Sequence, residues 1–237
     1  MVNNGSFFST SVVANGTVLF SNASVSYSGP ASPLGLPSTD GTTYGFQSTS
    51  YPTKADMDAD FPHGTYVFSL QPNDPTASPS MTSLTVGAEH YAPSGAPFLT
   101  GASYTALQGM DATKSISLGF SAFTTDASAS ESFVFLTVYD YSSNNWAFIS
   151  PALSATTTDM TLPANLLTPG HSYAYELDYS SRIQVPTANT DFAGQIGYEM
   201  RTQGFFVTAA VPEPETYAML LAGLGLIAAI GRRRRQH

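Results

Sequence analysis

Residues 132–150, SFVFLTVYDYSSNNWAFIS, contain the clearest fold signal in the chain. Their side chains alternate between two faces with a period of two, as in a β-strand. One face has Phe133, Phe135, Thr137, Tyr139 and Tyr141, and the other has Val134, Leu136 and Val138. The polar residues 142–145 interrupt this alternation before Trp146 and Phe148. The stretch therefore predicts a β-hairpin with a four-residue turn.

The same alternation recurs in SISLGFSAF at residues 115–123, in GTYVFSL at residues 64–70 and in the shorter GFFVT at residues 204–208. In LLTPGHSYAYELDYSS, at residues 166–181, a Pro-Gly turn precedes Tyr173 and a run of alternating aromatic residues. This spacing resembles the tyrosine corner of fibronectin type III and immunoglobulin-like domains, in which a Tyr hydroxyl bonds to the backbone just upstream. We therefore expect an all-β protein with an immunoglobulin or fibronectin type III-like β-sandwich.

We place this sandwich at residues 89–210 and a β-rich N-terminal region at residues 1–88. The N-terminal region also contains TKADMDADF, in which Thr53 precedes a short helix as its cap and Asp56 follows three residues later. Met57 and Phe61 share one helical face, and Pro62 ends the helix. Residues 1–88 are either a separate domain or extra strands of the same sandwich.

The composition limits the class of partner. Charged residues make up only 11% of the chain, there is no Cys, and Ser and Thr together make up roughly a quarter, which is typical of extracellular β-proteins. Four of the eight basic residues are Arg232, Arg233, Arg234 and Arg235, so the rest of the chain has four basic and 17 acidic residues and a net charge of −13. Such a body repels nucleic acid, which we exclude as a partner.

The end of the chain contains an uncharged apolar segment from Tyr217 to Gly231, followed directly by the Arg cluster. The segment is short for a bilayer, which takes about 20 apolar residues, but the stems of the arginines extend its reach. We expect a single transmembrane helix with the body outside and the Arg cluster in the cytoplasm. The alternatives are a buried C-terminal core helix, a permanent membrane anchor and a sorting signal that is cut off.

The residues just before the apolar segment favour the sorting signal. Val211, Pro212, Glu213 and Pro214 predict an extended, accessible stretch, because proline lacks a backbone N–H and disfavours helix before it. Pro-Glu-Pro, a short apolar helix and an Arg cluster, in this order, resemble the PEP-CTERM sorting signal of Gram-negative bacteria that make exopolysaccharide. The resemblance implies that an exosortase, a membrane-embedded protease or transpeptidase, recognises and removes the tail. It covers only residues 211–237.

Proteins with this signal are exported, so a secretory signal is expected at the other end. The first residues, MVNNGSFFST, have neither the basic region nor the apolar region of a secretory signal. We therefore expect that the natural protein starts further upstream, or that this chain is a fragment.

The chain shows no G-x-S-x-G, S-x-x-K or H-E-x-x-H motif and no phosphate-binding Gly loop, so we expect no enzyme, no catalytic residues and no cofactor. A Ser-His-Asp triad or a carboxylate pair assembled across the fold stays open. The four histidines are scattered, and no metal site is expected. Asp56, Asp58 and Asp60 resemble the start of a calcium loop but lack its Gly and Glu. Weak calcium binding through Asp40, Asp56 and Asp60 is the alternative.

The aromatic residues offer one candidate binding site. Tyr139, Tyr141 and Trp146 flank the predicted hairpin turn and could form a platform on which sugar rings stack. Alternating aromatic residues in strands are more often core residues or cross-strand pairs. Both interpretations stay open.

We expect an exported, non-enzymatic surface or matrix protein, linked to exopolysaccharide or biofilm. It would be held at the inner membrane in transit and then released to the surface or beyond by an exosortase-type enzyme. The main alternative is a carbohydrate-binding or carbohydrate-acting envelope protein that uses the hairpin platform. A third possibility is a membrane-tethered protein that is never processed.

Overall fold

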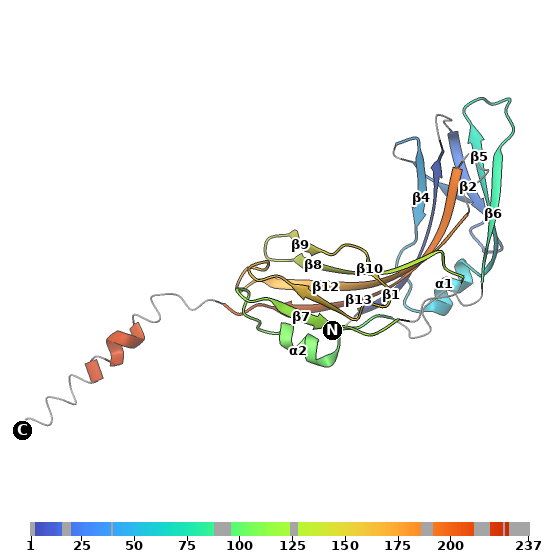
Figure 1. Ribbon diagram of the computed structural model, residues 1–237. Coiled ribbons are helices and arrows are strands. Elements are labelled where there is room, and N and C mark those ends of the chain that lie inside the picture. The colour runs from blue at the N-terminus through green and yellow to red at the C-terminus, as the bar shows by residue number, and fades with distance from the viewer. Residues whose placement is uncertain are drawn as a thin grey trace, which may run out of the picture.

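The computed structural model of the chain describes residues 3–15, 20–38, 40–87, 96–123, 128–185, 192–210, 219–224 and 226–227. The fold is all-β, as the alternation predicts, and its sheets are antiparallel. Figure 1 shows two arms that meet at a bend. The upper arm contains β2, β4, β5 and β6, and the lower arm contains β7, β8, β9 and α2.

One curled sheet runs through both arms and has seven strands within the described residues. Its order is β10-β8-β12-β13-β1-β4, and β9 pairs with the same edge of β8 as β10 does. The strands are β1 (Asn3–Ala14), β4 (Thr43–Gln47), β8 (Glu131–Asp140), β9 (Asn145–Ile149), β10 (Leu153–Ser154), β12 (Ser172–Gln184) and β13 (Phe192–Val207).

The long strand pairs β12–β13 and β1–β13 keep this sheet continuous through the bend. β12 and β13 pair without interruption from Tyr173 opposite Phe206 to Gln184 opposite Gln195. β1 pairs with β13 over twelve positions, so the first strand of the chain lies next to the last strand of the body. The regions on either side of the predicted boundary at residue 88 therefore share one sheet. Their division into domains stays a prediction.

A different layer covers the sheet in each arm. In the upper arm this layer is a four-stranded sheet of order β3-β2-β5-β6, formed by β2 (Phe20–Ser26), β3 (Leu34–Leu36), β5 (Gly64–Pro72) and β6 (Ser80–Val86). In the lower arm it is the pair β11-β7 with the helix α2, formed by α2 (Gly101–Leu107), β7 (Ile116–Gly119) and β11 (Asp159–Leu162).

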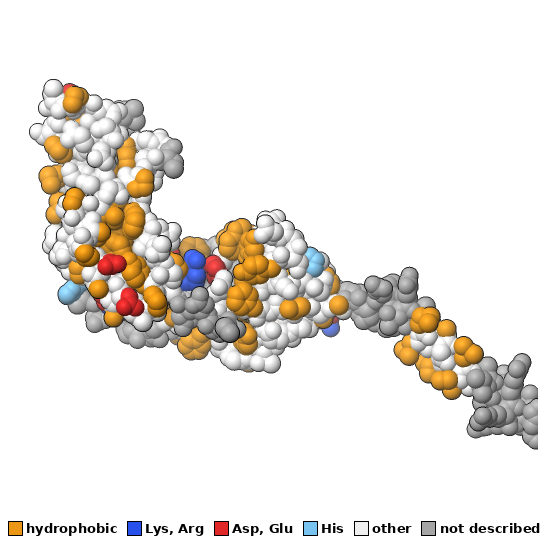
Figure 2. Space-filling model, turned by 180° about the vertical axis from the view of Figure 1, so that it is seen from behind, with side chains coloured by type: hydrophobic (Ala, Val, Ile, Leu, Met, Phe, Trp, Pro, Cys, Tyr) orange, Lys and Arg blue, Asp and Glu red, His pale blue; other side chains and the backbone are white. Residues whose placement is uncertain are grey.

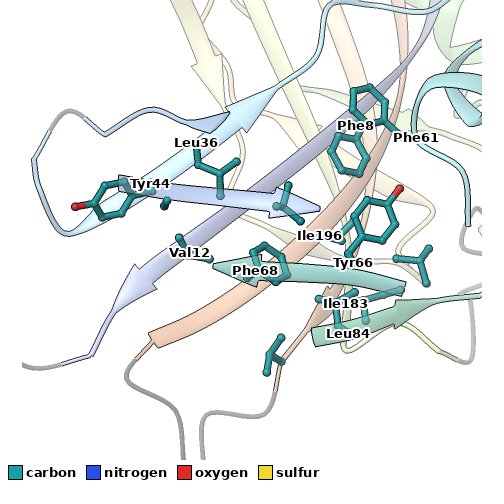
Figure 3. Packing of buried hydrophobic residues seen from close by; sticks show 14 of the residues in the cluster. Phe8, Val12, Leu36, Tyr44, Phe61, Tyr66, Phe68, Leu84, Ile183 and Ile196 are labelled. Carbon is teal, nitrogen blue, oxygen red and sulfur yellow. The ribbon is translucent and has the colours of Figure 1, made fainter. Parts of the chain in front are cut away.

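The two layers pack on the same face of the long sheet. Tyr179 belongs to the hydrophobic cluster of the lower arm, and Ile183, four residues further along β12, belongs to the cluster of the upper arm. Because residues i and i+4 of a strand point to the same side, one face of β12 serves both cores. Figure 3 shows the upper cluster, in which Phe8 stacks on Phe61 with ring centroids 4.0 Å apart.

The opposite face of the long sheet bears mostly half-buried and exposed side chains, and we call it the open face. It is defined by one residue from each of five adjacent strands: Tyr139, Glu176, Arg201, Ser9 and Gln47. In Figure 2, basic and acidic side chains gather at the bend beside a group of hydrophobic side chains on the lower arm.

The hairpin predicted at residues 132–150 forms from β8 and β9. Its four turn residues are 141–144, one position earlier than predicted, because Asn145 already pairs with Asp140. Asn144 accommodates the tight turn with a φ of 55°, a left-handed conformation that asparagine tolerates better than most residues.

The tyrosine corner also has the predicted bonds. The hydroxyl of Tyr173 accepts a hydrogen bond from the backbone N–H of Thr168 at 2.7 Å and donates one to the Thr168 carbonyl at 3.3 Å. Gly170 between them has a φ of 75°, which only glycine adopts without strain. This arrangement ties the preceding loop to the start of β12.

The short helix α1 (Lys54–Asp60) has the predicted cap. The Thr53 hydroxyl accepts a hydrogen bond from the Asp56 N–H, and Met57 and Phe61 are buried in the upper cluster. The helix therefore closes one end of the upper core with the two residues whose spacing places them on one face.

Candidate functional site

The three residues of the predicted platform lie together. The ring centroid of Tyr139 is 5.3 Å from that of Tyr141 and 5.1 Å from that of Trp146, and both pairs meet at 78°. Tyr141 is 53% exposed and Trp146 is 48% exposed. The core side of β8 is instead formed by Val134, Leu136 and Val138. The aromatic face of the predicted hairpin is therefore its outer face.

A fourth ring, which sequence reasoning missed, extends this group. Phe205 of β13 lies 6.0 Å from Tyr141, centroid to centroid, and is 41% exposed. Ala174 of β12 pairs with both Tyr139 and Phe205, so these residues form one row across three strands. We call Trp146, Tyr139, Tyr141 and Phe205 the aromatic row.

A shallow apolar hollow adjoins the aromatic row. It has a volume of about 430 Å³, and its walls include Tyr141 and Phe205. The other lining residues are Gln108, Ser172, Tyr173, Phe206 and Val207. The row thus offers ring faces and an adjacent recess of the size of a small ligand.

Asp140 holds the hairpin turn that positions Tyr141. Its Oδ1 accepts hydrogen bonds from the N–H groups of Ser142 and Ser143, and its Oδ2 lies 2.8 Å from the Nδ1 of His171. Burial acts to raise the pKa of Asp140, but the hydrogen bonds from His171, Ser143 and Ser142 outweigh it and lower the pKa. Sequence spacing could not reveal this pair, because its members are 31 residues apart.

The centre of the open face has an ion-pair group that the sequence also did not reveal. The Nε of Arg201 donates to the Oδ1 of Asp178 at 2.5 Å, and its Nη1 lies 3.5 Å from the Oε2 of Glu176. Burial raises the pKa of Asp178 to about 6, although Arg201 opposes the shift. A carboxyl with such a pKa can act as a general acid. Asp178, however, is only 7% exposed and accepts a hydrogen bond from Arg201, so we do not assign it that role.

The carboxylates considered for calcium have other partners. Asp56 accepts from the Thr53 hydroxyl, Asp60 accepts from the Tyr51 hydroxyl, and Asp40 accepts from the N–H groups at 42 and 43. Asp58 pairs with the Lys54 ammonium. In the part of the chain that the structure describes, no group of three or more His, Cys, Asp or Glu side chains is placed to hold a metal ion.

Most of the predicted sorting signal lies outside the described residues. This applies to Val211, Pro212, Glu213 and Pro214, to the segment ends Tyr217 and Gly231, and to Arg232, Arg233, Arg234 and Arg235. Residues 219–224 and 226–227 are helical. Among the residues described, no helix has the length and apolar character needed to cross a membrane, so the transmembrane helix stays a prediction.

The comparisons with known proteins bear mainly on the tail. No curated protein matches the chain. Among solved structures, a chain described as "Biofilm associated protein - BSP domain" is similar at 12% identity and a TM-score of 0.26. The match covers 87% of this chain and 28% of that one, so the chain spans little more than a quarter of that protein's length. The model of the PEP-CTERM protein-sorting motif matches residues 210–235.

This match confirms the resemblance drawn from Pro-Glu-Pro, the apolar segment and the Arg cluster. A motif of this kind marks an exported protein that an exosortase-type enzyme processes. Residues 210–235 of this chain are a PEP-CTERM protein-sorting motif.

Proposed function

We propose that the protein is a non-enzymatic component of the cell surface or extracellular matrix of a Gram-negative bacterium, and that its body binds exopolysaccharide. The apolar segment would span the inner membrane from Tyr217 to Gly231 while the protein is in transit. An exosortase-type enzyme would then cut near Pro-Glu-Pro and release the body to the surface. The body would work there as an immunoglobulin or fibronectin type III-like sandwich, a likeness that the Tyr173 corner supports.

The observation that carries the binding proposal is the aromatic row. Its exposed rings stand on the open face instead of packing in either core. The faces of Tyr and Trp pack on apolar ligand surfaces, and a sugar ring has such a surface on one side. Exposed apolar groups that adjoin one another mark interaction sites more often than isolated ones do. The row therefore offers a stacking surface for the rings of a sugar chain, with side chains from β8, β9, β13 and the hairpin turn.

The arrangement around His171 favours binding over catalysis. A His-Asp pair needs a nucleophile at the other ring nitrogen to work as a triad. Within the described residues, no hydroxyl forms a hydrogen bond with that nitrogen of His171, and Ser142 instead accepts from the Ser172 N–H. Asp140 and His171 together stabilise the hairpin turn, so we assign this pair a structural role.

Glycan binding by the purified full-length chain tests this proposal. The chain is kept in a detergent without a sugar headgroup, and titration calorimetry is run with neutral and acidic bacterial exopolysaccharide fragments. We expect Tyr141→Ala and Trp146→Ala each to weaken binding at least tenfold, because each removes an exposed ring. Met81→Ala is the matched control, since Met81 is 64% exposed on β6, outside the row.

Two results would contradict the proposal. One is binding that the ring variants leave unchanged, and the other is no binding of any fragment by the wild-type chain. Thermal unfolding of each variant shows whether a loss of affinity comes from a loss of fold. Because both rings are exposed, we expect their removal to change stability by only about 0.5 kcal/mol.

A further inference from the structure

A second hollow lies on the open face at the bend between the arms. It has a volume of about 410 Å³. It is lined by Ser9, Thr10, Ser11, Gly45, Phe46, Gln47, Arg182, Gln195 and Glu199. Gly45 is part of its wall, and the neighbouring Gly197 pairs with Ser9 on one side and with Arg182 on the other.

The polar side chains of this hollow have unused hydrogen-bonding groups. Within the described residues, the side-chain amides of Gln47 and Gln195 make no hydrogen bond to the protein, and the Arg182 guanidinium forms no ion pair. Arg182 is held in place by the Phe133 ring, whose centroid is 4.5 Å from its Cζ. Amides offer donors and acceptors together, and a guanidinium offers a planar set of donors. Such a set matches a ligand rich in hydroxyl groups.

The charges favour a neutral ligand over an acidic one. The hollow has one basic and one acidic side chain, Arg182 and Glu199. The other nearby cation, Arg201, is already paired with Asp178 and Glu176. The chain before the Arg cluster has a net charge of −13, and a body of this charge repels a polyanion.

The hollow and the aromatic row belong to the same face. Ala174, the strand partner of Tyr139 and Phe205 in the row, and Arg182 in the hollow are eight residues apart on β12 and therefore point to the same side. At about 3.3 Å per residue, the two places are roughly 26 Å apart. Between them the face bears the partly exposed Phe135, Glu176 and Arg201. One short saccharide cannot fill both places, whereas an extended chain can.

We propose that the hollow at the bend is a second sugar subsite, and that the open face binds an extended neutral polysaccharide from the aromatic row to Gln47 and Gln195. This inference rests on the proposed function, because it takes the row as the first subsite. To the proposed function it adds a neutral polysaccharide as the ligand, the direction of that polysaccharide along β12, and Gln47 and Gln195 as the residues that contact its far end.

Titration of the full-length chain with neutral glucan oligosaccharides of increasing length tests the inference. We expect a long oligosaccharide to bind at least tenfold more tightly than a trisaccharide. The double variant Gln47→Ala, Gln195→Ala should lose this gain and keep its affinity for the trisaccharide, which the row alone can hold. Gly45→Val should act in the same way by filling the hollow, because a Cβ at Gly45 makes only ordinary contacts, at 3.5 Å or more. Gln71→Ala on β5 is the control for loss of an amide.

The outcomes separate this inference from the proposed function. If the ring variants abolish binding and the hollow variants do not change the length dependence, the second subsite is wrong and the row stands. If a polyuronate of the same length binds more tightly than the neutral glucan, the neutral ligand class is wrong. If no saccharide binds to the wild-type chain, both proposals fail.

Discussion

The carboxylate of Asp178 lies 2.5 Å from the Nε of Arg201, on adjacent strands at the centre of the open face. Burial nevertheless raises the pKa of Asp178 to about 6, above the ordinary value of 3.8. The folded protein therefore holds a proton on Asp178 more tightly than the unfolded chain does. The contribution of this proton to stability is fully present below about pH 4 and is lost as the pH rises through about 6.

We expect Asp178→Asn to become more stable relative to the wild type as the pH rises from 4 to 6.5, by about 1–2 kcal/mol. Urea denaturation of both proteins across this range measures the difference. Asp74→Asn is the control and should change little over this range, because hydrogen bonds from Thr76 lower the pKa of Asp74 below its ordinary value of 3.8. A difference for Asp178→Asn that stays flat or falls with pH would show that burial does not dominate at this site.

Tyr173→Phe removes the hydroxyl that bonds to both backbone groups of Thr168. We expect a loss of about 1–2 kcal/mol in the free energy of unfolding, because the N–H of Thr168 is left without this partner. Tyr141→Phe removes a hydroxyl from an exposed ring and should change stability much less. Equal effects of the two variants in thermal or urea unfolding would argue against a structural role for the corner.

Gly204→Ala tests the packing beneath β13. A Cβ at this position would lie 2.5 Å from the Cε1 and the hydroxyl oxygen of Tyr175, which is buried in the lower cluster. We expect a loss of about 2–3 kcal/mol, since overpacking forces buried side chains from their preferred positions. Gly35→Ala is the matched control in β3, because nothing lies within 4 Å of its added Cβ. If Gly204→Ala is as stable as this control, the close approach of the Tyr175 ring is incorrect.

Asp140→Asn should weaken the hydrogen bonds that the Asp140 carboxylate makes to the hairpin turn and to His171. We expect a loss of about 1–3 kcal/mol near neutral pH, as for other hydrogen bonds to charged groups. Because the folded pKa of Asp140 is lowered, its contribution is present above about pH 4 and is lost as the pH falls through that lowered pKa. Unfolding at pH 7 and at pH 3 measures the loss, which should be smaller at pH 3. A cost that grows on acidification would be inconsistent with this assignment.

Processing of the tail can be followed by intact mass and cell fractionation. In its own host, behind a complete N-terminus, the protein should lose the residues after about Pro214 and leave the inner membrane. Replacement of both Pro212 and Pro214 by Ala should leave a full-length product in the membrane fraction. Pro79→Ala in the body is the control. A full-length wild-type protein in the membrane would mean that the tail is a lasting anchor.

Local sequence was enough to predict several elements. The capping pattern at Thr53 predicts α1, the Pro-Gly turn before Tyr173 predicts the corner bonds, and the polar residues 142–145 predict the β8–β9 hairpin to within one residue. These features depend on residues close together in the chain. The end of β13 was also visible in GFFVT, but its 16-residue length was not, because glycine and polar residues interrupt the apolar pattern before it.

The sequence by itself determined the β class of the body and the sorting motif at residues 210–235, since both depend on local order and spacing. The tertiary structure alone decided which face of β8 is buried. Both faces are rich in apolar residues, so a period of two could not distinguish Val134 from Phe135. It also decided that Phe205 joins Trp146 in one row and that Asp178 meets Arg201, because strand register is set by packing between distant segments.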